Sequence, residues 1–486
     1  MPETLDGTYE RTLQDIGNQN WEYAHRLLQC VAVAARPLRV EELADFLAFD
    51  FNTESSPIFR EDWRLQDPGY AVQSTCSSLL AIVDVDDSQV IQFAHFSVKE
   101  YLMSKRLREG NDTISRFHVS MTPAHTMIAH ACLGILLHLD ENITKHDLKK
   151  FPLANYAAEH WVSHALFEDV SPKIQNAVRC LFDPRKHHLV VWVWIYDPIS
   201  PLHHFDLSEY PSQPRAPPLH YAAFTGIHYL VEFLIISHSQ VVDSRCLDKT
   251  ALCIASRNGH SEVARVLLEH GADTEIKDDL SPLQRASYEG HAEVVQLLLE
   301  FGADVEARSQ YNNNALIFAS AKGQLAAVRV LLEHGAAVNS RGGLNKTPLH
   351  YAFKAGVAQI LLQHGADVNA RDDHGRTLLH YVLLYRACNR VEVAKFLLQH
   401  GAEVNLRDHV NETSLHLASQ GGHLDLVRLV LQRGADIHAQ DMQGRTPFQR
   451  ASLKGHSDVM RLLLEHGAKG HGLQSVRALH LRCSGS

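Results

Sequence analysis

The chain has 486 residues, of which 45% are hydrophobic and 21% charged, and its formal net charge is −10. This length allows two or three domains with cores of their own, and the composition is that of an ordinary globular protein. The eight cysteines include no CxxC pair, which argues against a zinc site or a disulfide framework and favours the cytosol or the nucleus. No apolar stretch reaches the roughly 18 residues that a membrane span needs, so we expect none.

The negative charge is concentrated near the start of the chain. Residues 1–110 hold 18 acidic against 10 basic residues, a net charge of −8, whereas the rest is nearly balanced. Because an acidic surface repels phosphate backbones, we expect no nucleic acid as a partner.

Residues 1–110 predict a winged-helix domain. Apolar residues at helical spacing predict a first helix over 5–17, and residues 81–96 alternate like two strands joined at 86–88. The other predicted helices of this domain lie at 20–36, 39–49, 71–80 and 98–107. The three helices at 20–36, 39–49 and 71–80, followed by the hairpin at 81–96, are the layout of a winged helix.

Residues 111–215 predict a helical connector. The stretch 127–139 is apolar but short and contains two histidines, so we expect a buried helix there. The apolar stretch 188–196 is expected to cover the first unit of the repeats that follow.

A repeat fills residues 216–469. Its anchor positions are separated by 33, 31, 33, 33, 30, 36 and 33 residues, and they are Pro217, Thr250, Ser281, Asn314, Thr347, Thr377, Thr413 and Thr446. A period near 33 with TPLH-type starts resembles an ankyrin array, here of eight repeats. Each repeat has two helices, and because neither can bury its apolar face alone, the repeats must stack into an α-solenoid. The tail 470–486 is predicted to be disordered.

Three repeats depart from the pattern. The fifth is three residues short around 355–358 and the sixth three residues long around 385–390, and we expect both changes in the turn between the paired helices. The first repeat ends in HSQ (238–240) instead of Gly-Ala, as a worn terminal repeat would.

The first part of the chain resembles a known family. The segments PETLDGTYERTL, LRVEELADFLAFDF, CSSLLAIV and FAHFSVKEYLMS are similar to the GPI inositol-deacylase-type winged-helix segment that follows the NACHT ATPase in fungal NLR-like (STAND) proteins. The stretches 152–166, 181–184 and 194–198 resemble the helical connector of the same proteins. The resemblance implies a sensor whose C-terminal repeats recognise a ligand.

The ATPase of that family has no counterpart in this sequence. A Walker A loop needs a Gly-Lys step to hold phosphates, and the sequence contains no Gly-Lys dipeptide. We therefore expect no nucleotide cofactor, and we expect Met1 to stand where the ATPase of a longer relative would end.

Catalytic and metal sites are not expected. No GxSxG or HExxH motif occurs, and the group His95, Ser97, Lys99 and Glu100 is interpreted as structural. Of the 33 histidines, 13 occupy fixed repeat positions: His220, His350, His380 and His416; His260, His291, His423 and His456; and His270, His334, His364, His400 and His466.

Two functional alternatives remain open beside protein binding. A transcription-linked DNA-binding regulator would read bases with the helix 71–80, but this helix has no Lys or Arg, and the wing at 84–87 is acidic. A hydrolase would depend on Ser97 or His95.

The sequence therefore predicts a mainly α, non-enzymatic scaffold that binds a partner protein on the concave face of its array, as the sensor-and-hinge half of an NLR-like signalling protein in the cytoplasm. We expect neither a metal nor a small-molecule substrate. The predicted partner-binding residues mix aromatic with basic side chains, as protein-binding patches do: Tyr221, Phe224, Arg257, Arg285, Tyr288, Phe318, Lys322, Tyr351, Tyr381, Tyr385, Arg450 and Lys454.

Overall fold

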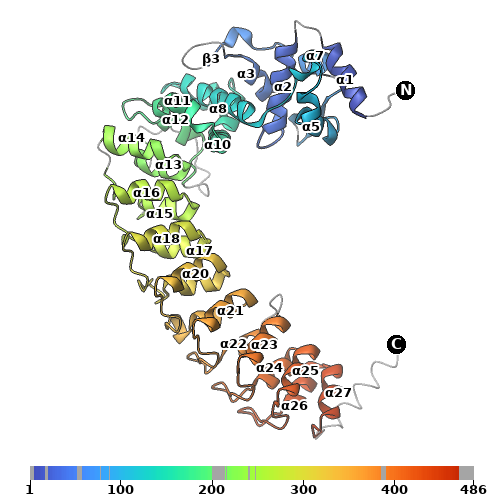
Figure 1. Ribbon diagram of the computed structural model, residues 1–486, viewed down its shortest axis with the longest axis vertical. Helices are drawn as coiled ribbons and strands as arrows, with labels where there is room; N and C mark the ends of the chain where they lie inside the picture. The colour runs from blue at the N-terminus through green and yellow to red at the C-terminus, as the bar shows by residue number, and fades with distance from the viewer. Residues whose placement is uncertain are drawn as a thin grey trace. The chain divides into compact units, whose positions relative to one another are not determined.

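The computed structural model of the chain describes residues 5–16, 20–51, 57–76, 78–86, 88–199, 214, 216–238, 241–246, 248–384 and 390–469. The protein is mainly helical and divides into two compact units, Met1–Cys246 and Leu247–Ser486 (Figure 1).

The first unit begins with the predicted winged helix. Its elements are α1 (Leu5–Asp15), α2 (Trp21–Val33), β1 (Leu38–Arg39), α3 (Val40–Leu47), β2 (Phe49–Asp50), β3 (Ile58–Phe59), η1 (Glu61–Trp63), α4 (Pro68–Cys76), β4 (Leu80–Val85) and β5 (Ser88–Phe93). Strands β1, β5 and β4 form an antiparallel sheet in that order, with Leu38 opposite Ile91. Both of these side chains are 1% exposed, so this face of the sheet covers the helices. Helix α4 begins before the predicted residue 71, because the Asp67 carboxylate accepts the backbone N–H of Tyr70 in its first turn.

Helices α5 (Phe96–Leu102) and α6 (Lys105–Arg108) complete the segment predicted as the winged helix. The helical connector that follows comprises α7 (Asp112–Ser115), α8 (Met121–His138), α9 (Lys145–Leu148), α10 (Leu153–Ala165), η2 (Ser171–Ile174), α11 (Gln175–Leu181) and α12 (His188–Ile195). Helix α8 contains the predicted buried stretch, and its Ile128, Cys132 and Leu136 are fully buried. Residues this apolar need a neighbour on every side, which α2, α10 and α11 supply.

The connector also packs against the first repeat helices, α13 (Pro218–Thr225) and α14 (His228–His238). Trp192 of α12 meets Trp161 at 5.5 Å and Tyr221 of α13 at 6.0 Å between ring centroids, both edge to face. Its indole N–H donates to the carbonyl of Ala158 at 2.8 Å. The segment 188–196 therefore covers the first repeat, as expected.

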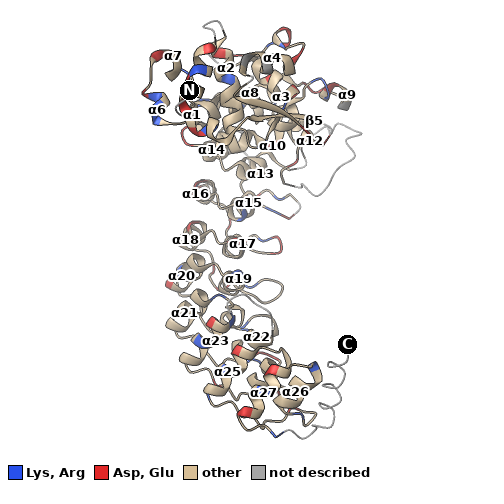
Figure 2. Cartoon of the chain, turned by 90° about the vertical axis from the view of Figure 1, so that its right-hand side faces the viewer, with Lys and Arg blue, Asp and Glu red and all other residues tan. Residues whose placement is uncertain are grey.

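The second unit is a stack of helix pairs. They are α15 (Ala251–Asn258) with α16 (Ser261–Glu269), α17 (Pro282–Glu289) with α18 (Ala292–Glu300), α19 (Ala315–Lys322) with α20 (Leu325–Glu333), η4 (Pro348–Tyr351) with α21 (Ala355–Gln363), α22 (Leu378–Leu384) with α23 (Arg390–Gln399), α24 (Ser414–Gln420) with α25 (Leu424–Gln432), and α26 (Pro447–Lys454) with α27 (Ser457–Glu465). Figure 2 shows α15, α17 and α19 in one column and α16, α18 and α20 in another, with the loops projecting beside the first column.

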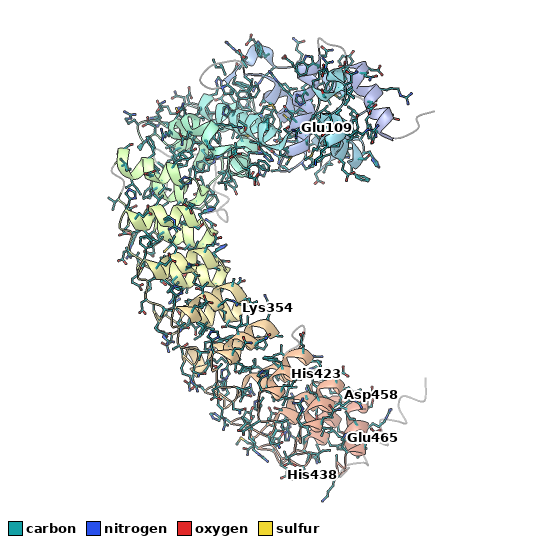
Figure 3. The ribbon with its side chains drawn as sticks, viewed as in Figure 1. Glu109, Lys354, His423, His438, Asp458 and Glu465 are labelled. Atoms are coloured by element: carbon teal, nitrogen blue, oxygen red, sulfur yellow. The ribbon has the colours of Figure 1, made fainter. Side chains whose placement is uncertain are left out.

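Neighbouring repeats are joined where the two helices of a pair meet. Gly259 ends α15 with φ +75°, and an added Cβ would lie 2.5 Å from the His291 ring of the next repeat. Glycine is therefore required there, and the close approach lets His291 Nε2 donate to the carbonyl of Arg257 at 3.0 Å. Equivalent bonds join Gln324 to Glu289, Lys354 to Gly323, and His456 to Gln420. Lys354 and His423, which hold this position in two repeats, lie on the same edge of the array (Figure 3).

The short fifth repeat differs from the prediction. We expected the missing residues in the turn between helices, but the first helix itself is reduced to the four-residue 3-10 turn η4. The second helix, α21, keeps nine residues, and its Val357, Ala358 and Leu361 are fully buried. These buried side chains stack directly on the neighbouring second helices. Shortening the second helix would therefore expose more apolar surface than shortening the first, and the deletion falls in the first helix. The extension of repeat six, 385–389, lies outside the described residues.

Candidate functional site: the exposed face of the array

Three of the predicted partner residues form one cluster on adjacent first helices. Tyr288 of α17 and Phe318 of α19 lie edge to face with ring centroids 6.2 Å apart. The ammonium group of exposed Lys322 sits 4.2 Å from the centroid of the Tyr288 ring, within the range of a cation–π contact. We call these three residues the Tyr288 cluster. Both rings are half-buried, so part of each remains available to a partner.

The other predicted residues are more dispersed. Arg257 and Lys454 are exposed, whereas Phe224 and Tyr351 are half-buried. Arg285 pairs with Asp278 at 3.3 Å, and the side chains are 20% and 10% exposed, so this arginine is mostly occupied within its own repeat. Tyr385 lies outside the described residues.

Three predicted partner residues are corrected by the structure, because two are buried and the third, Arg450, is occupied by carboxylates. Tyr221 is fully buried under Trp192 within the first unit. Tyr381 is 4% exposed and its hydroxyl donates to the Asp372 carboxylate. The Arg450 side chain is 12% exposed, and its guanidinium binds the carboxylates of Glu412 and Asp441.

Tyr381 and Arg450 act on the loops that join one repeat to the next, at residues 303–313, 336–346, 366–376, 402–412 and 435–445, which we call the finger loops. Asp372, Asp408 and Asp441 each accept two backbone N–H groups of their own loop through Oδ1, at 2.8–3.0 Å. The other oxygen, Oδ2, of these aspartates is bound by Tyr381, Arg376 and Arg450 respectively. These side chains therefore hold the finger loops in place instead of facing a partner.

A ladder of arginines ties the finger loops together. Arg308 donates to the carbonyl of Arg341 at 2.8 Å, Arg341 to that of Arg371 at 2.6 Å, and Arg407 to that of Gln440 at 2.9 Å. Arg371 bonds in the same way to Arg407. Because a guanidinium has five donors in a fixed plane, it can bridge two loops at once, which makes the finger loops one continuous surface.

Exposed apolar side chains lie at the tips of these loops. Tyr311 is 67% exposed, Leu344 55%, Val410 40% and Met442 62%, and we call these four residues the tip row. Backbone bonds link successive tips, from Asp373 N to Leu344 O and from Met442 N to Val410 O, each at 3.0 Å. None of these four residues was predicted from the sequence. Their signal is an apolar residue three or four positions before the repeat anchor, where turn residues are the rule.

The repeat histidines have structural roles. In the TPLH position, Nδ1 of His350, His380 and His416 accepts the backbone N–H of the helix-capping threonine, at 3.0–3.2 Å. Their Nε2 then donates to a carbonyl of the next repeat at 3.0–3.1 Å. The histidines before the cap glycine, such as His270 and His334, instead bond through Nδ1 to a carbonyl of their own helix.

This geometry predicts acid sensitivity. Burial lowers the pKa of His350, His380 and His416 below their ordinary value near 6.5. The unfolded chain therefore takes up protons first, so the stability is complete above about pH 6.5 and falls as the pH drops towards the folded-state pKa values. Gln284 already makes both bonds in repeat three, to Ser281 N and Ala307 O. We expect the triple variant with glutamine at 350, 380 and 416 to lose less stability than the native chain when the pH is lowered from 7 to 5, as measured by urea titration.

Glutamine at the exposed His374, His409 and His438 is the matched control and should keep the original pH dependence. If the control triple flattened the pH dependence as much as the buried triple, the acid sensitivity would arise elsewhere.

The group around His95 is a local helix cap. His95 precedes α5, and its Nδ1 lies 2.6 Å from Ser97 Oγ and accepts the Ser97 backbone N–H at 3.3 Å. Ser97 Oγ also bonds to the Tyr9 hydroxyl at 2.8 Å. A nucleophile's base must be free to take its proton, whereas this imidazole nitrogen is already used in capping the helix.

Among the residues that the structure describes, no group of three or more His, Cys, Asp and Glu side chains could hold a metal ion. In the same part of the chain, no helix has both the length and the apolar character that crossing a bilayer requires.

Comparison with known proteins agrees with this architecture. The family model described as ankyrin repeats (3 copies) matches residues 202–278, 274–342, 340–408 and 406–472. The model described as GPI inositol-deacylase, winged helix domain matches residues 9–116. The azaphilone pigments biosynthesis cluster protein L of Monascus ruber is 31% identical over 292 residues. That alignment covers 56% of this chain and 60% of the relative, so the chain spans less than two thirds of the relative's length.

Solved ankyrin structures also match part of the chain. The ankyrin repeat domain of Bcl-3 is 29% identical, with a TM-score of 0.39 over 44% of this chain and 98% of that one. The ankyrin repeat domain of human ASB11 is 26% identical, with a TM-score of 0.42 over 46% of this chain and 99% of that one. The ankyrin matches to the family model together extend over more than half of the 486 residues, and the chain therefore belongs to the ankyrin-repeat family.

Proposed function

We propose that the protein is a non-catalytic scaffold whose second unit binds a partner protein through the tip row and the Tyr288 cluster. The tip row is the observation that carries this proposal. Exposed apolar residues on a monomer are ordinary when single, but repeated ones in a line mark interaction sites. Here four of them sit on loops that are rigidly joined to one another.

The chemistry of the surface suits a protein partner. Tyrosine and methionine are enriched in the cores of interfaces, because they bury large areas and adapt to the opposite surface. The loops need little further ordering on binding, since the arginine ladder already fixes them, and this lowers the entropic cost of association.

The test compares two variants of the full chain in affinity capture with quantitative mass spectrometry. The tip variant carries Tyr311→Ser, Leu344→Ser and Met442→Ser. The control carries Phe301→Ser, Leu325→Ser and Leu464→Ser, at positions 42%, 44% and 41% exposed on the second helices or, for Phe301, directly after one. We expect partners of the native chain to be lost from the tip variant, by about 100-fold if each of the three side chains contributes about 1 kcal/mol. Equal capture by the tip variant and the native chain would contradict the proposal.

We further propose that the chain is the sensor-and-hinge half of an NLR-like protein of the cytosol. The winged-helix match beside ankyrin repeats supports this combination. The fungal source of the similar protein, Monascus ruber, is consistent with this proposal. Sequencing of the full transcript tests the proposal. We expect a GxxxxGK[ST] loop in frame upstream or in a neighbouring reading frame. If neither is found, the chain works without an ATPase and the proposal is wrong.

DNA binding and hydrolysis remain alternatives with clear tests. Helix α4 has no Lys or Arg, and Asp84 and Asp86 lie at the β4–β5 turn, so we expect no duplex binding at about 150 mM salt. We likewise expect no ester hydrolysis that depends on His95 or Ser97. Measurable duplex binding, or turnover lost in Ser97→Ala, would favour the corresponding alternative.

A further inference from the structure

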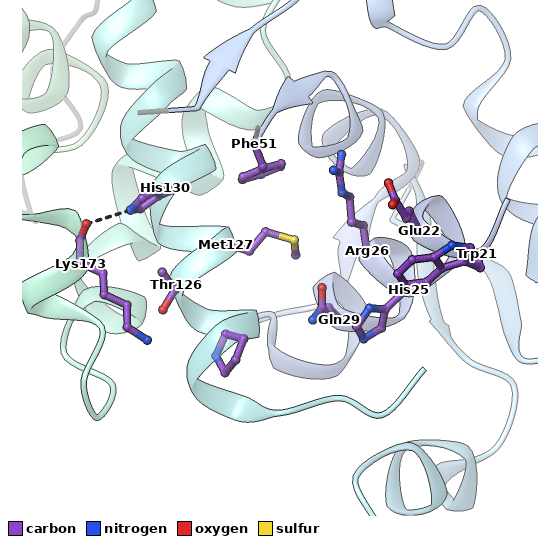
Figure 4. A pocket seen from close by; sticks show the side chains of 11 residues that line it. Trp21, Glu22, His25, Arg26, Gln29, Phe51, Thr126, Met127, His130 and Lys173 are labelled. Carbon is purple, nitrogen blue, oxygen red and sulfur yellow. Dashed lines mark hydrogen bonds between the residues drawn. The ribbon is translucent and has the colours of Figure 1, made fainter. Parts of the chain in front are cut away.

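A cleft in the first unit lies between one face of α2 and one face of α8. Its volume is about 520 Å³, within the range of small-molecule sites. Helix α2 contributes side chains one turn apart, including Trp21, His25 and Gln29, and α8 contributes Met127 and His130. Figure 4 shows Met127 extending from α8 towards α2, with Phe51 and Arg26 on one side of it and Gln29 on the other.

The cleft contains a polar side chain that is itself largely buried. Gln29 is 9% exposed and lines the cleft. Its primary amide can both donate and accept a hydrogen bond. A ligand in the cleft would supply both the acceptor and the donor that a primary amide needs.

Two cationic groups also line the cleft. The guanidinium of Arg26 lies 5.1 Å from the centroid of the Phe51 ring, a cation–π contact made by its face, so the N–H groups at its edge can still donate to a ligand. The Lys173 backbone carbonyl is bound to His130 Nε2 at 3.2 Å, whereas its side chain is exposed at the rim. Glu22 is the single carboxylate among the lining residues, so positive charge predominates.

The remaining walls are flat or apolar. Trp21 and His25 are stacked, with ring centroids 6.4 Å apart and planes inclined by 25°. His25 Nε2 donates to the carbonyl of His118 at 3.2 Å, which fixes the ring. Burial lowers the pKa of both His25 and His130, which keeps them neutral near pH 7. The two imidazoles therefore add aromatic surface and leave the positive charge to Arg26 and Lys173.

From these groups we infer that the cleft between α2 and α8 binds a small planar aromatic carboxylate. Its ring packs against Trp21, Phe51 and Met127, its carboxylate binds Arg26 or Lys173, and a polar ring substituent pairs with Gln29. A charge-assisted bond to a guanidinium is stronger than a neutral one, so the acid is favoured over its neutral amide. The site lies apart from the array and does not depend on the function proposed for it, and it adds a small-molecule ligand that the sequence did not lead us to expect.

The test titrates 2-naphthoate and its neutral isostere 2-naphthamide into the full chain by isothermal calorimetry. We expect 2-naphthoate to bind about tenfold more tightly than the amide, as a charged hydrogen bond implies. Arg26→Gln should weaken naphthoate binding by about the same factor and leave amide binding unchanged. Arg11→Gln, at an exposed position of α1 outside the cleft, is the matched control and should bind like the native chain.

Lys173→Gln provides a second variant in case Arg26→Gln proves unstable. Because Lys173 is exposed at the rim, its replacement should leave folding unaffected. Weaker naphthoate binding in either variant, with an unchanged Tm of the free protein, supports the site. Equal affinities for the acid and the amide would overturn it, as would native affinity in both variants or no naphthoate binding at millimolar concentration.

Discussion

Replacing Trp192 by alanine is expected to destabilise the first unit by about 3–5 kcal/mol, the usual cost of removing a buried aromatic side chain. Trp192 is 1% exposed and contacts Trp161, Phe182 and Tyr221, so its removal opens a cavity between the connector and the first repeat. The carbonyl of Ala158 also loses its indole donor. Urea titration should show the loss, and hydrogen exchange should rise in α13 and α14.

Trp63→Ala is the control, because Trp63 is 45% exposed. A change within about 0.5 kcal/mol is expected there. If Trp192→Ala were no more damaging than Trp63→Ala, the connector would not cover the first repeat.

Replacing Arg450 by alanine is expected to destabilise the end of the array by about 3 kcal/mol, because it leaves buried carboxylates without their partner. Asp441 and Glu412 are 5% and 7% exposed. Burial would raise the pKa of Asp441, but bonds from the Arg445 backbone and the Arg450 side chain bring it down to about 2. Glu412 has a raised pKa because burial outweighs the attraction of Arg450. Without Arg450 both carboxylates become costlier to keep charged.

Lys454→Ala on the same helix tests whether the effect is specific, since Lys454 is exposed. We expect near-native urea unfolding for Lys454→Ala and an earlier transition for Arg450→Ala. Similar unfolding of the two variants would show that Arg450 has no structural role and would return it to the set of surface residues.

Much of the fold could be predicted because it depends on local and repeated patterns. The threonine anchors, the glycines between helices and the apolar second helices recur with a fixed period, and each has one physical function. The winged helix was predictable for the same reason: the period changes from helical spacing to strict alternation at residues 81–96.

The candidate site was harder to predict, because exposure depends on contacts between repeats. Tyr381 and Arg450 occupy the same repeat position as Arg285 and Phe318, four residues after the anchor, and only their bonds to Asp372 and Asp441 show that they face the finger loops. Met442 and Leu344 are unremarkable in the sequence, and their role follows from the way the finger loops line up.

The short fifth repeat illustrates the same limit. The spacing of its anchors showed that three residues were missing but not which element would lose them. Which helix is shortened depends on the cost of shortening each one. Helix α21 is buried against its neighbours on either side. The first helix, in contrast, can end at Tyr351 and still keep its capping bond from Thr347 to His350.

Hydrogen–deuterium exchange of the full chain, alone and bound to a captured partner, tests the binding surface most directly. We expect slower exchange in the finger loops of the bound chain, above all around Tyr311, Leu344, Val410 and Met442, and at the ends of α17 and α19 that carry the Tyr288 cluster. Slower exchange confined to the second helices, such as α18, α20 and α27, with unchanged finger loops, would contradict it.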